Sequence, residues 1–161
     1  MTRHLFLTGA KGVGKSTLMR RLLAEETEPV GGFFTQKENG AIYLRRPSQP
    51  LSQEQFLFYC GQGGDPARFD TLGCAALAQT AGCGLLVMDE LGPHEAAAAA
   101  FQAAVFRTLD GELPVLGVLQ QTHSDFLQRV AAHPEVTVLT VTAENRDTLA
   151  AQLFAWRQSV K

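Results

Sequence analysis

The sequence predicts a three-layer α/β fold, with a mostly parallel central sheet, helices on both faces and one added antiparallel hairpin. The first observation behind this prediction is that short apolar runs alternate along the chain with longer amphipathic segments. The second is that these apolar runs are nearly continuous, which is typical of parallel strands buried on both faces. The length of 161 residues fits one domain, and we expect that domain to span residues 1–161.

Each strand and helix is predicted from its own local pattern. Apolar residues of the longer segments recur at four-residue spacing, as in Phe101, Val105 and Leu109, so that one stripe of each helix faces the sheet. Pro93 opens one helix, at a position where its missing N–H costs nothing. We expect strands at 4–8, 85–89, 115–119 and 136–141, and helices at 15–26, 66–81, 93–109, 124–132 and 144–158.

The segment after the first helix departs from this alternation. Two runs of β-forming residues flank Asn39-Gly40, a dipeptide that strongly favours a tight hairpin turn. We therefore expect an antiparallel hairpin over residues 32–46, added to the sheet. Residues 47–65 are rich in Pro, Gln and Gly, and their pattern supports no assignment beyond a loose connection.

A complete phosphate-binding loop, G-x-x-x-x-G-K-[ST], stands between the first predicted strand and the first predicted helix. Its glycines let the backbone turn tightly and point N–H groups at phosphate oxygens. Lys15 places a cation against the β- and γ-phosphates, where it also assists catalysis, and the Ser16 hydroxyl is a ligand for Mg²⁺. The helix N-terminus adds the positive end of its dipole. The residues expected to bind a nucleoside triphosphate are Gly9, Ala10, Lys11, Gly12, Val13, Gly14, Lys15, Ser16 and Thr17.

Two carboxylates end the predicted strand at 85–89, on the side of a parallel sheet where ligands bind. Asp89 is expected to hold Mg²⁺ through a water molecule. Glu90 is placed to accept a proton from an attacking water, a role worth about 10²–10⁴-fold in rate. The pair could instead simply cap the following helix, but the phosphate loop upstream favours the catalytic interpretation.

With these two motifs, the chain resembles the THEP1-type nucleoside-triphosphatases along its whole length, most thinly between residues 45 and 82. The resemblance implies the P-loop NTPase fold, slow and base-tolerant hydrolysis of ATP, GTP and other triphosphates, and Mg²⁺ as cofactor. The strings that carry it, besides the loop, are Gly32-Phe33-Phe34-Thr35, Met88-Asp89-Glu90-Leu91-Gly92-Pro93-His94-Glu95, Pro114-Val115-Leu116-Gly117 and Val141-Thr142-Ala143-Glu144-Asn145-Arg146.

The chain departs from that family's usual pattern in three places. His94 stands where the family usually has Met, Lys37 stands where it usually has an acidic residue, and the segment 47–82 is shorter. These departures concern substrate choice, because the hydrolytic residues themselves are all present.

Several further polar residues are weaker candidates for the site. Arg146 follows the last predicted strand and is expected to contact the nucleotide, although Asn145 could simply cap the last helix with Arg146 in solvent. Thr35 could reach Mg²⁺ or the γ-phosphate, but a position in a hairpin strand is the commoner explanation for a threonine. Arg107 lies on a helix and is expected to be solvated.

Gln120 and Gln121 end the strand expected between the phosphate-loop strand and the Asp89 strand, and one of them could orient the attacking water. The spacing of the four histidines does not favour a zinc site. These histidines are His4, His94, His123 and His133.

Net charge and cysteine content indicate which partners and which cellular compartment to expect. The net charge of −2 gives no global attraction to nucleic acid or anionic membrane, and the pairs Arg20-Arg21 and Arg45-Arg46 lack interleaved aromatic residues. Three cysteines without paired spacing favour a reducing compartment. We expect a cytoplasmic monomer whose partner is a nucleoside triphosphate, without nucleic acid or membrane.

Three functions are compatible with these motifs, and hydrolysis of a nucleoside triphosphate ranks first. The second is a small kinase that passes the γ-phosphate to a nucleoside or other small acceptor, with Arg45, Arg46 and Arg68 as the candidates for a cationic lid. The third is a nucleotide-dependent switch, because residues 89–92 match the D-x-x-G pattern. The guanine-reading N-K-x-D motif does not occur in the sequence, which disfavours a strict GTPase.

Overall fold

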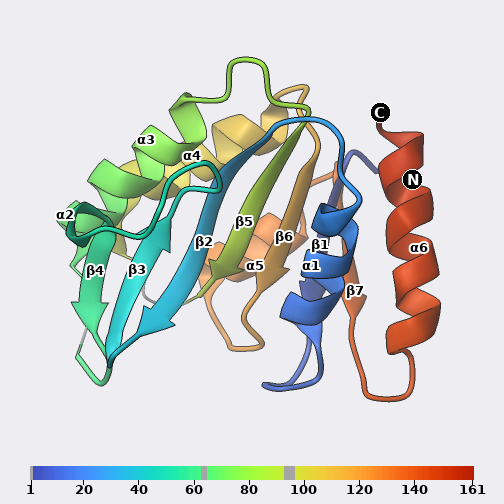
Figure 1. The fold of residues 1–161 in the computed structure, drawn as a ribbon, viewed down its shortest axis with the longest axis horizontal. Helices are drawn as coiled ribbons and strands as arrows, with labels where there is room; N and C mark the ends of the chain where they lie inside the picture. Colours follow the sequence, from blue (N-terminus) through green and yellow to red (C-terminus); the bar gives the residue numbers. More distant parts are fainter. Residues whose placement is uncertain (1, 63–64, 93–96) are drawn as a thin grey trace.

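A seven-stranded sheet forms the centre of the molecule, with its strands in the order β4-β3-β2-β5-β6-β1-β7 (Figure 1). The computed structural model describes residues 2–62, 65–92 and 97–161. The strands are β1 (His4–Thr8), β2 (Val30–Glu38), β3 (Ala41–Arg45), β4 (Phe56–Tyr59), β5 (Leu85–Leu91), β6 (Val115–Leu119) and β7 (Val136–Thr140). The pairs of β2 with β5, β5 with β6, β6 with β1 and β1 with β7 are parallel. The predicted, mostly parallel sheet is therefore confirmed.

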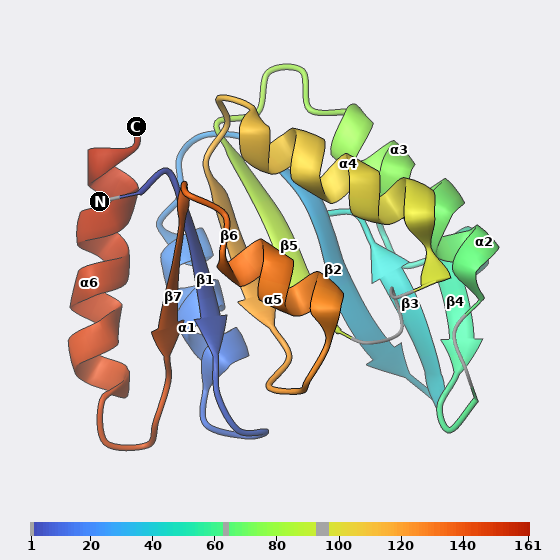
Figure 2. The ribbon, with the colours of Figure 1, turned by 180° about the vertical axis from the view of Figure 1, so that it is seen from behind.

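Helices cover both faces of this sheet (Figures 1 and 2). On one face lie α1 and α6, and on the other lie α2 to α5 (Figures 1 and 2). The helices are α1 (Lys15–Ala24), α2 (Pro66–Arg68), α3 (Cys74–Ala78), α4 (Ala99–Asp110), α5 (Asp125–Ala131) and α6 (Arg146–Ser159). A short 3₁₀ turn, η1, spans Gln53–Gln55, and a π-helical turn, η2, spans Phe69–Gly73. Residues 93–96, which include the predicted helix start at Pro93, lie outside the described residues.

Each face of the sheet packs its own apolar cluster. On the α1 and α6 side, Leu5, Leu7 and Trp156 are buried together. On the other side, Phe33 and Phe101 meet edge to face, with ring centroids 5.7 Å apart. Since burying one such side chain stabilises a fold by about 1.5–3 kcal/mol, both layers hold the sheet, and with it the loops at its carboxyl edge.

The predicted hairpin is present but is larger than expected. Its turn is at Asn39-Gly40, where both φ angles are positive, at 49° and 78°, as the tightest hairpin turns require. The first part of β2 pairs parallel with β5, and only its second part pairs with β3. The unassigned segment 47–65 contributes a third antiparallel strand, β4. Its four residues are all aromatic or apolar, too short a run to predict alone.

β5 extends to Leu91 instead of ending at residue 89 as predicted, so Asp89 and Glu90 lie inside the strand. Asp89 pairs with Val118 and Leu91 pairs with Leu119, which leaves Glu90 as one extra residue in the ladder. Such irregularities re-aim side chains and are frequent beside active sites. The interpretation of the two carboxylates as helix caps is therefore wrong, because they belong to the strand itself.

The predicted helix over 66–81 is interrupted by the η2 turn and ends at Ala78. Gly73, at the end of this turn, packs closely against α4: a Cβ built on it would lie 2.1 Å from Cδ1 of Phe101. Asp70, on the same turn, accepts a hydrogen bond of 2.8 Å from the backbone N–H of Phe101. Asp70 thus satisfies an open N–H in the first turn of α4, whose own start offers no capping side chain.

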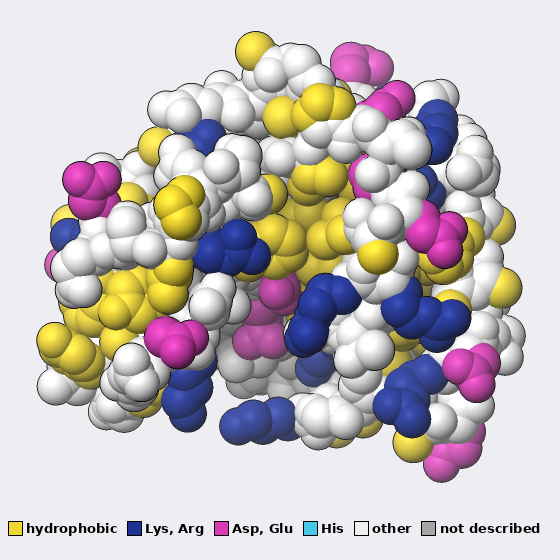
Figure 3. Space-filling view, viewed as in Figure 1, with side chains coloured by type: hydrophobic (Ala, Val, Ile, Leu, Met, Phe, Trp, Pro, Cys, Tyr) yellow, Lys and Arg dark blue, Asp and Glu magenta, His cyan; other side chains and the backbone are white. Residues whose placement is uncertain are grey.

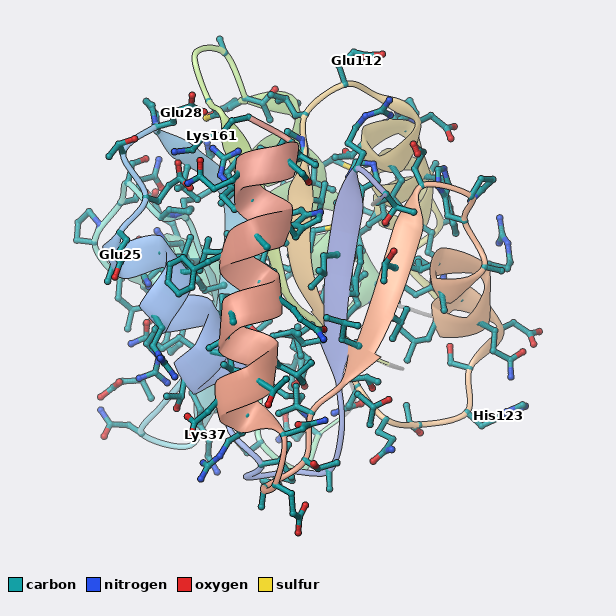
Figure 4. All side chains as sticks on the ribbon, turned by 90° about the vertical axis from the view of Figure 1, so that its right-hand side faces the viewer. Glu25, Glu28, Lys37, Glu112, His123 and Lys161 are labelled. Atoms are coloured by element: carbon teal, nitrogen blue, oxygen red, sulfur yellow. The ribbon has the colours of Figure 1, made fainter. Side chains whose placement is uncertain are left out.

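The far end of the molecule is tied by a buried ion pair. Arg157 on α6 donates to Glu26 at 2.6 and 2.9 Å and to Glu28 at 3.0 Å. Glu28 and Lys161 lie at the end opposite to Lys37 (Figure 4). The pair therefore joins the C-terminal helix to the α1–β2 connection, away from the carboxyl edge of the sheet.

Candidate active site

The phosphate-binding loop crosses the carboxyl end of β1 and leads into α1. Gly9, Gly12 and Gly14 have φ angles of 145°, 81° and 108°, a region that side chains disfavour and glycine adopts freely. The helix ladder starts at once, since the N–H of Leu18 donates to the carbonyl of Gly14 at 3.0 Å. Helix α1 therefore aims its open N-terminus into the loop, as an anion site requires.

Two of these glycines also lie against residues from the far end of the chain. A Cβ on Gly9 would lie 2.5 Å from the carbonyl oxygen of Val141, and a Cβ on Gly14 would lie 2.7 Å from Cδ of Arg146. Arg146, the first residue of α6, thus rests directly on the loop, where we predicted a nucleotide contact. It is exposed, so its guanidinium is available to a phosphate.

Asn145 lies at the start of α6, but its side chain makes no capping bond to that helix. Its Oδ1 accepts from the N–H of Thr142 at 2.7 Å, and its Nδ2 donates to the carbonyl of Thr140 at 2.9 Å. The prediction of a simple cap is therefore wrong. Asn145 shapes the β7–α6 connection, and this connection presents Arg146 to the loop.

A cleft of about 820 Å³ opens over the loop. Its walls bring together side chains from five places in the chain, among them Lys15 and Ser16 on α1, Lys37 on β2, Glu90 on β5 and Gln120 after β6. Acidic side chains lie in a hollow of this face, with basic side chains around it (Figure 3). A cleft with cationic walls and an anionic centre suits a phosphate chain with its metal ion.

The residues of the loop differ in whether they line the cleft or pack into the core. The residues that line the cleft are Gly9, Ala10, Lys11, Gly12, Gly14, Lys15, Ser16 and Thr17. Val13 instead packs against the apolar cluster under α1 and α6. The Nζ of Lys15 donates to the carbonyl of Gly9 at 2.5 Å, so its ammonium lies over the loop that it is expected to serve.

Asp89 is a partly buried carboxyl group in a charged setting. Burial, and next the charge of Glu90, raise the pKa of Asp89 to about 6, while Arg20 and Lys15 act to lower it. A divalent cation would favour the ionised form further. Carboxylate and hydroxyl oxygens are the ligands that Mg²⁺ prefers, so the chemistry of Asp89 and Ser16 suits a metal ion. Ser16 lines the cleft, whereas Asp89 is not among its lining residues.

Glu90 and Gln120 meet in the cleft. Nε2 of Gln120 donates to Oε1 of Glu90 at 3.3 Å. As predicted, β6 lies between β1 and β5, and this order carries Gln120 to the carboxylate. The neighbouring Gln121 also lines the cleft. The structure therefore pairs the expected base with one of the two glutamines.

Sequence reasoning missed two basic residues of this region. In the sequence, Arg20 appears only as half of the pair Arg20-Arg21, which lacks the aromatic residues of a nucleic-acid surface, yet its charge acts on the pKa of Asp89. Its position four residues after Ser16, on the same side of a helix, was the available signal. Lys37 appeared only as a departure from a family pattern, because nothing in the sequence shows that β2 continues to the cleft.

The remaining candidates lie elsewhere. Thr35 lines a second pocket beside the cleft rather than the cleft itself. Arg107 is exposed on α4 and borders a separate cavity with Cys74. His4 is buried, and both of its ring nitrogens form hydrogen bonds with the backbone of Leu109 and Val115.

In the part of the chain that the structure describes, which omits His94, no three His, Cys, Asp or Glu residues are grouped to hold a metal. Among the described helices, none has the length and apolar character needed to cross a membrane.

Comparison with known proteins gives consistent matches. A family model described as NTPase matches residues 65–154. The chain is 36% identical to the nucleoside-triphosphatase THEP1 of Methanosarcina barkeri, covering 93% of this chain and 94% of that one. It is 29% identical to the protein of the same name from Thermofilum pendens, covering 94% and 93%.

Two solved structures share the fold. The crystal structure of THEP1 from Aquifex aeolicus superposes with a TM-score of 0.78 at 17% identity, covering 94% of this chain and 97% of that one. The solution structure of a human cancer-related nucleoside triphosphatase superposes with a TM-score of 0.70 at 25% identity, covering 99% of each chain. The three-layer P-loop fold is thereby confirmed.

Proposed function

This chain belongs to the THEP1-type family of nucleoside-triphosphatases and is a nucleoside-triphosphate hydrolase; we propose that it uses Mg²⁺ and accepts ATP, GTP and other triphosphates with little selectivity for the base. The observation that carries this proposal is the meeting of the phosphate loop with Glu90 and Gln120 in one cleft. The loop alone would bind a phosphate chain, and the carboxylate beside it adds a base for water.

Binding begins with the loop and the residues that rest on it. Backbone N–H groups and the α1 N-terminus surround the phosphates. The Lys15 ammonium exchanges the carbonyl of Gly9 for phosphate oxygens, which hold a cation more strongly because they are charged. Arg146 contacts the nucleotide from the side of α6.

Ser16 and Asp89 would hold the metal. A Mg²⁺ ion held there would supply positive charge that offsets the negative charge of the phosphate groups during the reaction. The chemistry of these two side chains supports the assignment, since a hydroxyl and a carboxylate are hard oxygen donors.

Glu90 accepts the proton of the attacking water in this mechanism. Its hydrogen bond from Gln120 restrains the carboxylate and leaves the amide oxygen of Gln120 to orient the water. The oxygen of that water bonds to the γ-phosphorus, and the nucleoside diphosphate leaves with the bridging oxygen.

Low base selectivity is supported by the absence of N-K-x-D from the sequence. On the side of Arg146, the connection before α6 exposes Ala143 and Glu144, which do not form a dedicated guanine reader. We further propose that the protein acts as a cytoplasmic monomer on free nucleotides, without nucleic acid or membrane. Its unpaired cysteines and its net charge of −2 support this setting.

Phosphate release from ATP, GTP, CTP and UTP, each with Mg²⁺ or with EDTA, tests these proposals. We expect kcat/KM values for the four nucleotides within about tenfold of one another. Such a range corresponds to a difference of about 1.4 kcal/mol in transition-state stabilisation. EDTA should remove turnover. A much larger preference for one base would contradict the proposed selectivity, and full activity in EDTA would contradict the role of Mg²⁺.

A further inference from the structure

A second pocket, of about 370 Å³, adjoins the phosphate cleft on the side of the hairpin. The two cavities share Lys11, Lys37, Ile42, Glu90 and Gln120. The proposed base therefore stands at the border between them, with the nucleotide site on one side and this pocket on the other.

The wall of the pocket is apolar and well packed. Leu57 and Phe69 are each only 2% exposed, and the rings of Phe58 and Phe69 lie 6.2 Å apart. These residues come from β4 and η2, the elements that the sequence pattern did not reveal. The wall is therefore part of the folded core and is present before any ligand binds.

Hydrolysis by itself does not require such a space. One water molecule occupies about 30 Å³, so this pocket holds roughly ten times what the attacking water needs. Pockets for small organic ligands measure about 300–1,000 Å³ and combine apolar walls with a few polar groups. Here the polar groups are Lys11, Thr35, Lys37, Glu90 and Gln120.

We propose that this pocket binds a small ring-containing alcohol, about the size of a nucleoside, and that its hydroxyl replaces water as acceptor of the γ-phosphate. The apolar wall takes the ring, and the hydroxyl lies toward Glu90. This inference rests on the proposed function, because it uses the same nucleotide site and the same base.

The transfer step balances without any further reactant. The hydroxyl oxygen bonds to the γ-phosphorus, and the hydroxyl proton passes to the Glu90 carboxylate. The bond from the γ-phosphorus to the bridging oxygen breaks, and its electron pair leaves with the nucleoside diphosphate. The products are a phosphomonoester and a diphosphate, and Glu90 returns its proton to solvent.

The test follows ATP with Mg²⁺ by phosphorus NMR, which separates inorganic phosphate from a phosphomonoester. The probes are uridine, thymidine, pyridoxine and benzyl alcohol, with glycerol at equal concentration as an alcohol without a ring. We expect at least one ring alcohol to yield a phosphomonoester at a rate at least about tenfold above that with glycerol.

A variant that fills the second pocket with a larger side chain tests whether the ester forms there. Cys60 is exposed and lines only this pocket, not the phosphate cleft. Cys60→Trp should leave hydrolysis without probe within about twofold of the parent and reduce ester formation at least tenfold, whereas Cys60→Ser should change neither.

Two results would overturn the proposal while leaving the hydrolase intact. One is normal release of inorganic phosphate with no ester from any ring alcohol. The other is ester formation that is equal with glycerol and unaffected by Cys60→Trp. If neither phosphate nor ester forms, the hydrolase function fails and the acceptor site fails with it.

Discussion

Lys15 lies with its Nζ 2.5 Å from the carbonyl oxygen of Gly9, where it is held ready at the loop before nucleotide binds. A hydrogen bond to a charged group is worth about 1.5–3 kcal/mol. Lys15→Ala should therefore weaken triphosphate binding by about 10- to 100-fold. Titration of the protein with a fluorescent ATP analogue in Mg²⁺ measures this loss.

Lys161→Ala is the matched control, because Lys161 lies at the other end of the molecule (Figure 4). Its affinity should equal that of the parent. If Lys15→Ala binds triphosphate as tightly as this control does, Lys15 does not contact the phosphates.

At the level of single residues, the sequence predicted the loop and both carboxylates because each belongs to a local string with its own chemistry. Arg20 and Lys37 escaped prediction because their relevance arises only from folding. A helix turn brings Arg20 within electrostatic range of Asp89, and the length of β2 brings Lys37 to the cleft. The contact of Arg146 with Gly14 likewise depends on how β7 and α6 are connected.

Among the elements, the junction of η2 with α4 depends on one side chain. Asp70 caps α4 through the N–H of Phe101, and losing a cap costs about 0.5–2 kcal/mol. Asp70→Ala should therefore lower the free energy of unfolding by about 1 kcal/mol in urea titration. Asp65 caps only the three-residue α2, so Asp65→Ala should cost clearly less. Equal losses would mean that Asp70 has no special role in starting α4.

The longer elements were predictable because apolar residues repeat along them, and their ends moved by only a few residues. The elements without a repeat were not predictable. β4 has only four residues, and the local pattern over 66–81 does not show that the helix changes to a π-helical turn at Phe69–Gly73. Both missed elements form the wall of the pocket beside Glu90, so the part of the site that sequence reasoning did not find is the part built by tertiary packing.

For the whole molecule, a buried histidine couples stability to pH. The N–H of Val115 donates to Nδ1 of His4 at 3.1 Å, so Nε2 carries the proton that is donated to Leu109 at 2.8 Å. Burial lowers the pKa of His4 below its ordinary value of 6.5, and the nearby charges of Arg3 and His133 act in the same direction, whereas the hydrogen bond to Leu109 and the charge of Glu135 oppose it. The folded state therefore needs the neutral ring.

As the pH falls, His4 of the unfolded chain binds a proton at a higher pH than His4 of the folded protein. The contribution of His4 to the free energy of unfolding should therefore be fully present above about pH 6.5 and should decrease as the pH drops below that value. Urea titrations between pH 7.5 and 5 measure this slope. In His4→Gln the slope over this range should be shallower, whereas in His123→Gln, a change at an exposed residue, it should match the parent. An unchanged slope in His4→Gln would show that His4 does not control it.

The strand order of the sheet brings the phosphate loop and the carboxylates of β5, which are far apart in the sequence, to one site. β6 separates β1 from β5, so the phosphate loop and Glu90 lie on either side of one strand. Gln120 directly follows that strand and lines the same cleft. The alternation of strands and helices predicted this layered arrangement, since parallel strands place their carboxyl ends at one edge. The central claim is accordingly that Glu90, at this edge, activates water against the γ-phosphate.

A single-turnover measurement on Glu90→Gln, which records ATP binding and phosphate release in the same sample with Mg²⁺, tests that claim most directly. Glu112→Gln, at an exposed glutamate far from the cleft (Figure 4), is the matched control and should behave as the parent. We predict that Glu90→Gln binds ATP within about threefold of the parent but releases phosphate at least about 100-fold more slowly, as loss of a general base requires. Phosphate release at the parental rate with intact binding would contradict the assignment of Glu90 as the base.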